Sequence, residues 1–124
     1  MISYFYDSYS IIAYLDGNTN YKKYFTDEKG ITTKLNLMEV YYKVLKEYGE
    51  AKAELNFDSF MPLVVGASDD VIKRAMKLRL SLQKQKKNIS YVDAIGYQIA
   101  LDNNLKFLTG DREFKDLKNV EFVR

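Results

Sequence analysis

Short β-prone runs and helical patterns alternate along the whole chain. The runs that predict strands cover residues 2–6, 31–35, 60–65, 105–108 and 120–123. Apolar residues recur at helical spacing between them, most clearly over 8–15, 36–48, 69–86 and 90–103, with one more turn of helix expected over 50–55. Pro62 predicts an edge position for the third strand. Strands that alternate with helices favour right-handed crossovers, so we expect an α/β fold with a mainly parallel sheet of four to five strands.

Composition limits the chain to a single domain, residues 1–124, and narrows its chemistry. The absence of Cys excludes disulfides and thiolate metal sites. The absence of His removes the commonest general base and the usual zinc ligand. No apolar run approaches the ~20 residues that span a bilayer, and the start MISYFYDS has no signal-peptide pattern. We therefore expect a cytoplasmic protein, without membrane contact, whose catalysis would use carboxylates, hydroxyls, Lys or Arg.

Four acidic residues stand where a predicted strand turns into a helix, or in the first turn of that helix. They are Asp7 in YFYDS, Glu39 in LNLMEV, Asp93 in SYVDAI and Asp111 in LTGDREF. Because an open parallel sheet binds ligands at the carboxyl ends of its strands, we expect these side chains to converge. Four carboxylates in one crevice repel each other, and a divalent cation would keep them ionised. Oxygen ligands suit Mg²⁺ or Mn²⁺, so the pattern predicts metal-dependent phosphodiester chemistry.

Two of these acids also fit a purely structural role. Asn36-x-x-Glu39 and Ser90-x-x-Asp93 both resemble capping boxes, in which the carboxylate binds the amide of the N-cap residue. For either acid alone, capping is as good an interpretation as a shared site. The occurrence of all four acids at one predicted sheet edge favours the shared site.

The other acids differ in how well a structural role explains them. Asp7 directly follows an apolar strand, where a carboxylate would be partly buried and would need a partner. Asp111 alone would be better explained as a turn residue or as an exposed pair with Arg112. Asp116, five residues further on, is an accessory candidate for which a surface role is the better interpretation.

Basic residues concentrate in the segment 69–87, which carries seven Lys or Arg against two Asp. Lys73 and Lys77 of this segment are candidates for phosphate contacts, and the alternative is a solvated helix face. Arg112 lies beside the predicted acidic site and is a second candidate, with pairing to Asp111 or Glu113 as its alternative. The overall net charge of +2 does not by itself indicate a nucleic-acid substrate.

Four motifs together resemble PIN-domain nucleases, and within them the small VapC-type toxins of toxin–antitoxin pairs. The motifs are Asp7-Ser8, Leu37-Met38-Glu39-Val40, Tyr91-Val92-Asp93-Ala94 with Ala100 and Asn104-Leu105 downstream, and Leu108-Thr109-Gly110-Asp111-Arg112-Glu113-Phe114. The second motif departs from the family pattern, because it opens with Asn36 where Ser or Thr is frequent. The resemblance spans nearly the whole chain and is weakest over residues 50–88.

The resemblance implies a three-layer α/β/α sandwich and an Mg²⁺- or Mn²⁺-dependent ribonuclease. Asp7, Glu39, Asp93 and Asp111 would bind the metal, and Ser8 and Thr109 would support them through their hydroxyls. It also implies an RNA substrate, a small antitoxin as partner, and a homodimer. The expected reaction is in-line hydrolysis of an RNA phosphodiester by a metal-bound water, with Asp7 as the central ligand.

Three alternatives to a toxin nuclease remain. A PIN nuclease with a housekeeping role in RNA processing would have the same motifs, and so would a catalytically inactive PIN-like binding module. The complete set of four acids argues against the inactive module. A phosphoacceptor receiver domain would carry paired acids after its first strand and a Lys where Asp111 stands, whereas here Ser8 follows Asp7.

The chain is rich in aromatic residues, with eleven Tyr and seven Phe. Tyr41 and Tyr42 are adjacent in a predicted helix and cannot both face the core, so some aromatic surface is expected to be exposed. Such a surface would suit a dimer interface, an antitoxin segment or stacking on RNA bases.

Overall fold

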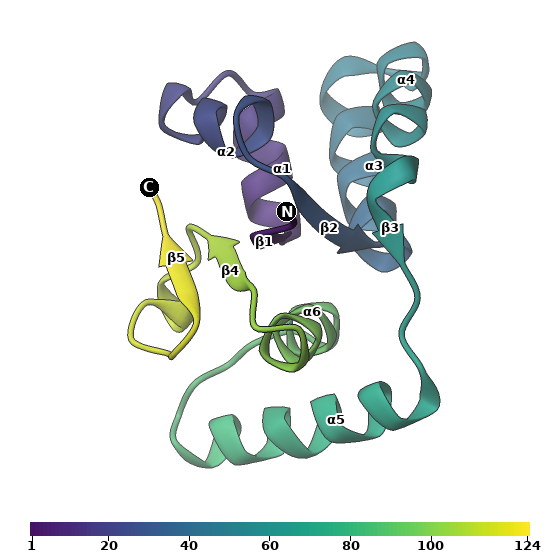
Figure 1. The fold of residues 1–124 in the computed structure, drawn as a ribbon. Coiled ribbons are helices and arrows are strands. Elements are labelled where there is room, and N and C mark those ends of the chain that lie inside the picture. The colour runs from purple at the N-terminus through teal and green to yellow at the C-terminus, as the bar shows by residue number, and fades with distance from the viewer.

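A five-stranded parallel sheet forms the middle layer of the computed structural model, which describes all 124 residues (Figure 1). The strand order is β3-β2-β1-β4-β5. The strands are β1 (Tyr4–Tyr6), β2 (Gly30–Thr33), β3 (Val64–Val65), β4 (Lys106–Thr109) and β5 (Val120–Phe122). The predicted α/β class and parallel sheet are confirmed.

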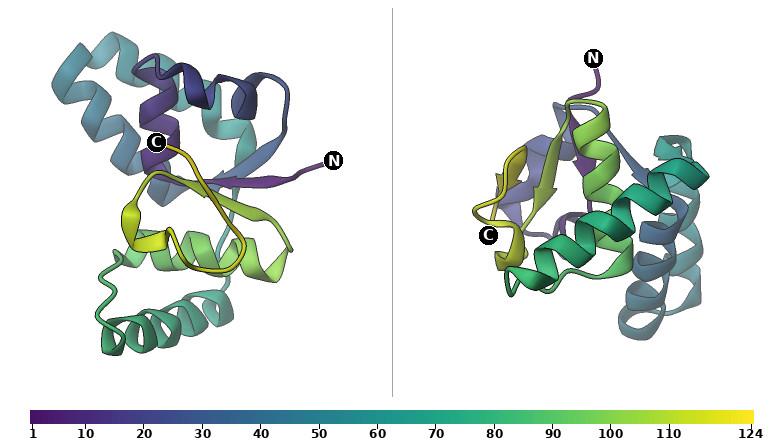
Figure 2. Two further views of the ribbon diagram at one scale, coloured as in Figure 1. Left: turned by 90° about the vertical axis from the view of Figure 1, so that its left-hand side faces the viewer. Right: turned by 90° about the horizontal axis from the view of Figure 1, so that it is seen from below.

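Helices cover both faces of the sheet, which makes the predicted three-layer α/β/α sandwich (Figure 2). One face carries α1 (Ser8–Leu15), α2 (Lys22–Thr26), α3 (Lys34–Tyr48) and α4 (Glu50–Phe60). The other face carries α6 (Tyr91–Asp102), and α5 (Asp69–Lys84) packs on α6 as the outermost element. Three short 3₁₀ helices complete the chain, η1 (Thr19–Tyr21), η2 (Met61–Leu63) and η3 (Arg112–Phe114). None of the helices has the length and apolar character needed to cross a bilayer.

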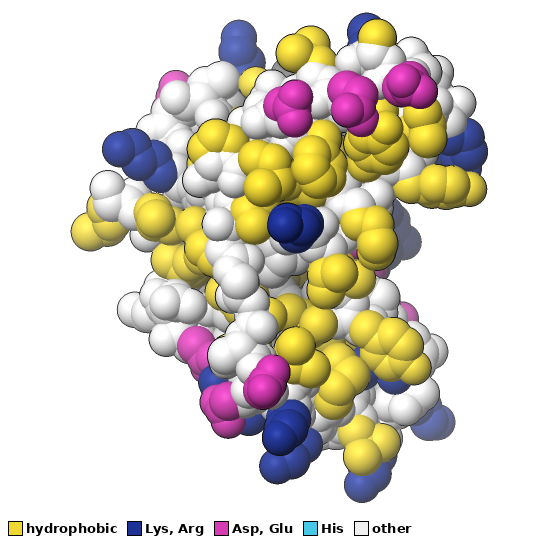
Figure 3. Space-filling model, turned by 90° about the vertical axis from the view of Figure 1, so that its right-hand side faces the viewer, with side chains coloured by type: hydrophobic (Ala, Val, Ile, Leu, Met, Phe, Trp, Pro, Cys, Tyr) yellow, Lys and Arg dark blue, Asp and Glu magenta, His cyan; other side chains and the backbone are white.

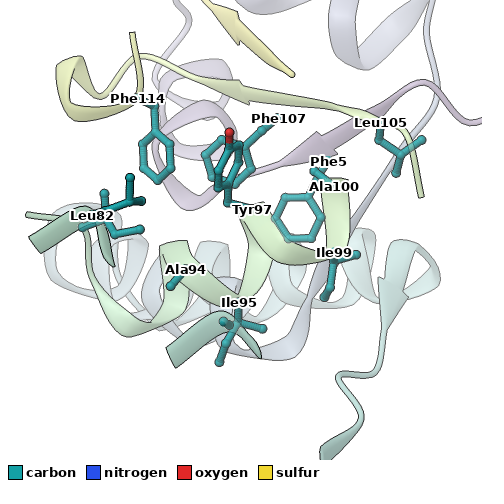
Figure 4. Close-up of a cluster of buried hydrophobic side chains, with 12 residues drawn as sticks. Phe5, Leu82, Ala94, Ile95, Tyr97, Ile99, Ala100, Leu105, Phe107 and Phe114 are labelled. Atoms are coloured by element: carbon teal, nitrogen blue, oxygen red, sulfur yellow. The ribbon is translucent and has the colours of Figure 1, made fainter. Parts of the chain in front are cut away.

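Alternating side chains of the central strands supply the two halves of the core. Phe5 of β1 and Phe107 of β4 point toward α6, where their rings stack at 5.7 Å (Figure 4). Tyr6 and Leu108, the next residue of each strand, point into the opposite cluster with α1 and α3. Gly96 allows α6 to lie close to the sheet, because a Cβ at this position would lie 2.5 Å from the Phe5 ring. This packing fixes the first turn of α6 beside the carboxyl ends of β1 and β4.

The predicted strand over residues 60–65 is wrong in extent. Helix α4 continues to Phe60, and Pro62 lies in the first turn of η2, where its missing N–H has no helical partner to lose. Only Val64 and Val65 remain to pair with β2. The short strand does occupy a sheet edge, as Pro62 predicted. The single turn expected over 50–55 is instead an eleven-residue helix.

Candidate active site

The four acidic residues singled out from the sequence line one pocket of about 730 Å³ at the carboxyl end of the sheet. Asp7 follows β1, Asp111 follows β4, Asp93 stands in the first turn of α6, and Glu39 projects from α3. Glu39 lies in the second turn of its helix, one turn later than the sequence predicted, because α3 already begins at Lys34. The structure thus brings together side chains that are up to 104 positions apart in the sequence.

Asp7 is the most deeply buried acid of the pocket, with 1% of its surface exposed. It is the N-cap of α1, and its carboxylate accepts a 2.7 Å hydrogen bond from the backbone amide of Ser10. Burial raises the pKa of Asp7 to about 8, hydrogen bonds from Thr109 and Ser10 oppose that rise, and the charge of Asp93 adds to it. Without a nearby cation, the ionised form of Asp7 is therefore unfavourable at neutral pH.

Asp93 belongs both to the capped first turn of α6 and to the lining of the pocket. The Ser90 hydroxyl accepts a 3.0 Å hydrogen bond from the Asp93 amide, which confirms Ser90 as the N-cap of α6. Burial raises the pKa of Asp93 to about 6, a hydrogen bond to Ser90 opposes this, and the charges of Glu39 and Asp111 raise it further. The carboxylates of the pocket are therefore close enough to repel one another.

A chain of hydrogen bonds holds Glu39 in place. Asn36 Nδ2 donates to Ser8 Oγ at 3.0 Å, and Ser8 Oγ donates to Glu39 Oε1 at 2.5 Å. Thr33 Oγ1 in turn donates to Asn36 Oδ1 at 2.6 Å. The direction of these bonds is set by the amide group of Asn36, because only its nitrogen donates, so the Ser8 proton points at the carboxylate.

Asn36 is not the N-cap of α3, contrary to the sequence prediction. Thr33 caps the helix, since its hydroxyl accepts from the Asn36 amide at 3.3 Å. Asn36 is fully buried in the first turn, where its side chain bridges Thr33 and Ser8. The capping box predicted for Asn36 and Glu39 is therefore absent, and the structural alternative for Glu39 loses its basis.

Asp111 retains the turn role that was its alternative interpretation. Its carboxylate caps η3 by accepting from the Glu113 amide at 3.0 Å, while its own amide donates to Thr109 Oγ1 at 3.0 Å. Thr109 is fully buried, and its hydroxyl contacts the Asp7 carboxylate while accepting from the Asp111 backbone amide. The Ser8 hydroxyl thus contacts the Glu39 carboxylate, and the Thr109 hydroxyl contacts the Asp7 carboxylate.

The basic candidates and Asp116 lie outside the pocket lining. Lys73 and Lys77 are exposed on α5, which packs on the side of α6 away from the sheet (Figure 2). Arg112 is exposed and forms an ion pair with neither Asp111 nor Glu113. Instead, the pocket wall formed by α3 carries Tyr42, one of the two tyrosines named for exposed aromatic surface, and Lys43 and Lys46, which sequence reasoning missed. The spacing of Lys43 and Lys46 from Glu39, four and seven residues, is the signal that would have found them.

The donor set of the pocket fits a hard divalent cation. Its ligating atoms are carboxylate and hydroxyl oxygens, and a cation would relieve the repulsion that raises the pKa of Asp93. No three acidic side chains are close enough to one another to bind a single ion together.

A second pocket, of about 670 Å³, is lined mainly by apolar residues such as Tyr14, Phe25 and Phe60 and contains none of the four acids.

Three solved structures share this fold over almost their whole length. A toxin–antitoxin complex from Klebsiella pneumoniae matches with a TM-score of 0.76 and 20% identity, covering 96% of both chains. The Mycobacterium tuberculosis toxin VapC20, which cleaves the sarcin–ricin loop, matches with a TM-score of 0.77 and 16% identity over 98% of this chain and 99% of that one. DNA-bound VapBC from Salmonella typhimurium matches with a TM-score of 0.76 and 15% identity over 99% and 98%.

Sequence comparison identifies the family directly. No curated protein matches the sequence. The PIN domain family matches residues 4–120, from the first strand to the start of the last. Because this match covers nearly the entire chain and agrees with the observed fold, the protein belongs to the PIN domain family.

Proposed function

We propose that this protein is a metal-dependent ribonuclease of the VapC type that hydrolyses RNA phosphodiester bonds as the toxin of a type II toxin–antitoxin system. The observation that carries the proposal is the convergence of Asp7, Glu39, Asp93 and Asp111 on one pocket in a PIN domain. The likeness in fold to VapC20, a toxin that cleaves the sarcin–ricin loop, supports a nuclease activity for this protein.

Each acid has a distinct part in the proposed reaction. Asp7 lies deepest and would be the central ligand of a bound cation, with Asp93 and Asp111 as further ligands beside it. Glu39 approaches from α3, and Ser8 and Asn36 keep its carboxylate oriented toward the pocket. A bound Mg²⁺ or Mn²⁺ would supply Lewis-acid activation of water and stabilise charge on the phosphate. The pocket offers no His or Cys, so the chain itself provides no covalent nucleophile of that type.

Cleavage of labelled single-stranded RNA tests the proposal. Purified protein is incubated with RNA in Mn²⁺, Mg²⁺ or EDTA, beside Asp7→Asn, Asp93→Asn and the control Asp116→Asn. We expect cleavage only with a divalent cation, loss of at least 100-fold in the first two variants, and full activity in the control. The ribonuclease proposal is wrong if RNA is not cut under any metal after removal of co-purified protein, or if the Asp7 and Asp93 variants cut like the wild type.

We further infer that the protein forms a homodimer and binds a small antitoxin. Hydrophobic side chains gather on the face where β3 forms the sheet edge (Figure 3), and apolar surface of this kind marks protein interfaces. The fold neighbours from Klebsiella and Salmonella are a toxin–antitoxin complex and a VapBC complex. Sedimentation velocity of the purified protein measures the dimer directly, and a monomer at micromolar concentration contradicts it.

Growth after induced expression separates a toxin from a housekeeping nuclease. A toxin arrests growth when it is expressed alone, and Asp93→Asn removes the arrest. Normal growth with wild-type protein that cleaves RNA in vitro would favour the housekeeping alternative.

A further inference from the structure

One wall of the acidic pocket is a single face of α3. Glu39, Tyr42, Lys43 and Lys46 stand at positions i, i+3, i+4 and i+7 of this helix, and all four line the pocket. The opposite face, which includes Val40 and is buried, anchors the helix in the core. The α3 wall therefore runs from an acidic end near Asp7 to a basic end at Lys46, on a helix whose position is fixed by packing.

Lys46 is the cation of this wall that is free to bind a ligand. Lys43 is paired with Glu47 at 2.6 Å on the same helix, so its charge is largely balanced. Lys46 forms no ion pair, and its ammonium group lies over the ring of Tyr42, 5.5 Å from the centroid. The ring and the cation thus form one compact aromatic and basic unit at the mouth of the pocket.

Tyr42 presents an open aromatic face beside this cation. Its side chain is 65% exposed, although it lines the pocket. Exposed aromatic rings next to a positively charged group are the elements on which single-stranded nucleic acids stack, at ~1–3 kcal/mol per base. Tyr48, two residues beyond Lys46, differs because its hydroxyl is bound to Asp16 at 2.9 Å and it does not line this pocket.

The distance along α3 between Glu39 and Lys46 suits a short segment of a nucleic-acid strand. A rise of about 1.5 Å per residue separates Lys46 from Glu39 by about 10 Å along α3. About three stacked nucleotides cover that length at about 3.4 Å each. The acidic end repels a polyanion, so a strand that reaches the four carboxylates needs an attractive contact nearby, and Lys46 is the nearest unpaired cation on the wall.

We propose that Tyr42 and Lys46 form a binding subsite for single-stranded RNA, in which one base stacks on the Tyr42 ring and an adjacent phosphate contacts Lys46. The inference rests on the proposed ribonuclease function and assigns substrate contacts to α3 in place of Lys73 and Lys77. Because the subsite is joined to the acidic end in one pocket, a strand held there extends toward Asp7.

Binding of a short labelled single-stranded RNA tests the subsite, measured by fluorescence anisotropy in Mg²⁺ with every protein in an Asp93→Asn background. Tyr42→Ala is expected to weaken binding about 5- to 100-fold, while Tyr42→Phe retains affinity because it keeps the ring. Lys46→Gln is expected to weaken binding and to reduce the slope of log affinity against log salt by about 0.7, the value for one phosphate contact.

The matched controls are Tyr48→Ala and Lys52→Gln. Lys52 lies 5.2 Å from the centroid of the Tyr48 ring, so this pair has a similar ring–cation distance outside the pocket. Both controls should bind RNA like the parent protein. In the active enzyme, Tyr42→Ala should raise KM more than it lowers kcat, because the contact is made equally in the substrate complex and the transition state.

The two proposals fail in different ways. If the wild type cleaves RNA but the Tyr42 and Lys46 variants bind and cleave like the controls, the subsite is refuted and the ribonuclease function stands. If the same variants leave RNA binding unchanged and weaken binding of a protein partner, the α3 wall is a protein interface and the RNA subsite is refuted. Absence of any metal-dependent cleavage by the wild type refutes the function, and the subsite with it.

Discussion

Asp7 places a carboxylate where water hardly reaches, and the free energy of unfolding should depend on pH as a result. The pKa of Asp7 is raised by burial to about 8 in the folded protein, against an ordinary value of 3.8. The folded state therefore binds more protons than the unfolded state between these values, so stability falls as pH rises from about 4 to about 8. Asp93, with its pKa raised to about 6, acts in the same direction over a narrower range.

Replacing Asp7 by Asn should remove most of this pH dependence. Asn keeps the N-cap hydrogen bond from Ser10 but carries no charge. In metal-free buffer at pH 8 we expect Asp7→Asn to stabilise the fold by on the order of 5 kcal/mol, and to change stability little at pH 4. Urea denaturation at several pH values measures this, with the exposed Asp116→Asn as control. A variant as pH-dependent as the wild type would contradict the assignment of the raised pKa to Asp7.

Asn36 should act on catalysis only through Glu39. Its amide nitrogen orients Ser8, which donates to the Glu39 carboxylate. Asn36→Ala leaves the buried Thr33 hydroxyl without its acceptor, and we expect a loss of about 1–3 kcal/mol in stability together with a lower kcat. If the effect on kcat passes through Glu39, Asn36→Ala will add no further loss of kcat in a Glu39→Gln background. Additive losses of kcat would show that Asn36 contributes by another route.

At the scale of elements, the closeness of α6 to the sheet positions Asp93. A Cβ at Gly96 would lie 2.5 Å from the Phe5 ring, which is shorter than a van der Waals contact. Gly96→Ala should therefore destabilise the protein by about 2 kcal/mol, even though Ala is favoured over Gly in an ordinary helix by about 1 kcal/mol. Gly66→Ala is the matched control, because nothing lies within 4 Å of a Cβ there. Thermal denaturation distinguishes the two variants. A Tm of Gly96→Ala equal to that of the wild type would mean that α6 moves away from the sheet without loss of stability.

The elements that sequence patterns predicted well are those with a local signal. Strand β1 is an apolar run that ends directly before Asp7. The N-cap of α6 is Ser90, as predicted. The run Phe60–Val65 was misread because an apolar run of this length has the same composition at the end of a helix as in a strand. The start of α3 was misread because Thr33 and Asn36 are both good capping residues, and only the packing of Asn36 against Ser8 decides between them.

The sequence does not determine which basic residues lie at the pocket. A count of charges locates a basic segment at 69–87, but it does not say which side of the sandwich the segment covers. Helix α5 packs on α6 and so carries Lys73 and Lys77 away from the pocket. Lys46 carries the same charge in a less basic stretch, and it lines the pocket because α3 packs on α1 and contacts β2. Position relative to the sheet edge, which is a tertiary property, decides which cation can meet the substrate.

For the whole molecule, the four carboxylates couple the global stability to divalent cations. Repulsion among them and the burial of Asp7 both disfavour the folded state in metal-free buffer at pH 7.5, and a bound cation relieves both effects. At a cation concentration of about 100 times Kd, binding to the folded state adds about 2.7 kcal/mol of stability. For a domain of this size that amounts to a rise in Tm of very roughly 10 °C. Removal of the cation by EDTA should reverse the rise.

The dependence of Tm on divalent cations also separates binding at the pocket from general binding to an acidic surface. The Asp7→Asn, Asp93→Asn double variant should be more stable than the wild type without metal and nearly insensitive to Mn²⁺ or Mg²⁺, because the repulsion is relieved by substitution instead of by a cation. Differential scanning fluorimetry with and without EDTA measures both effects. An equal rise in Tm for the wild type and the double variant would place the cation outside the pocket. In that case the raised pKa values of Asp7 and Asp93 would serve no metal site, and the four acids would need another explanation.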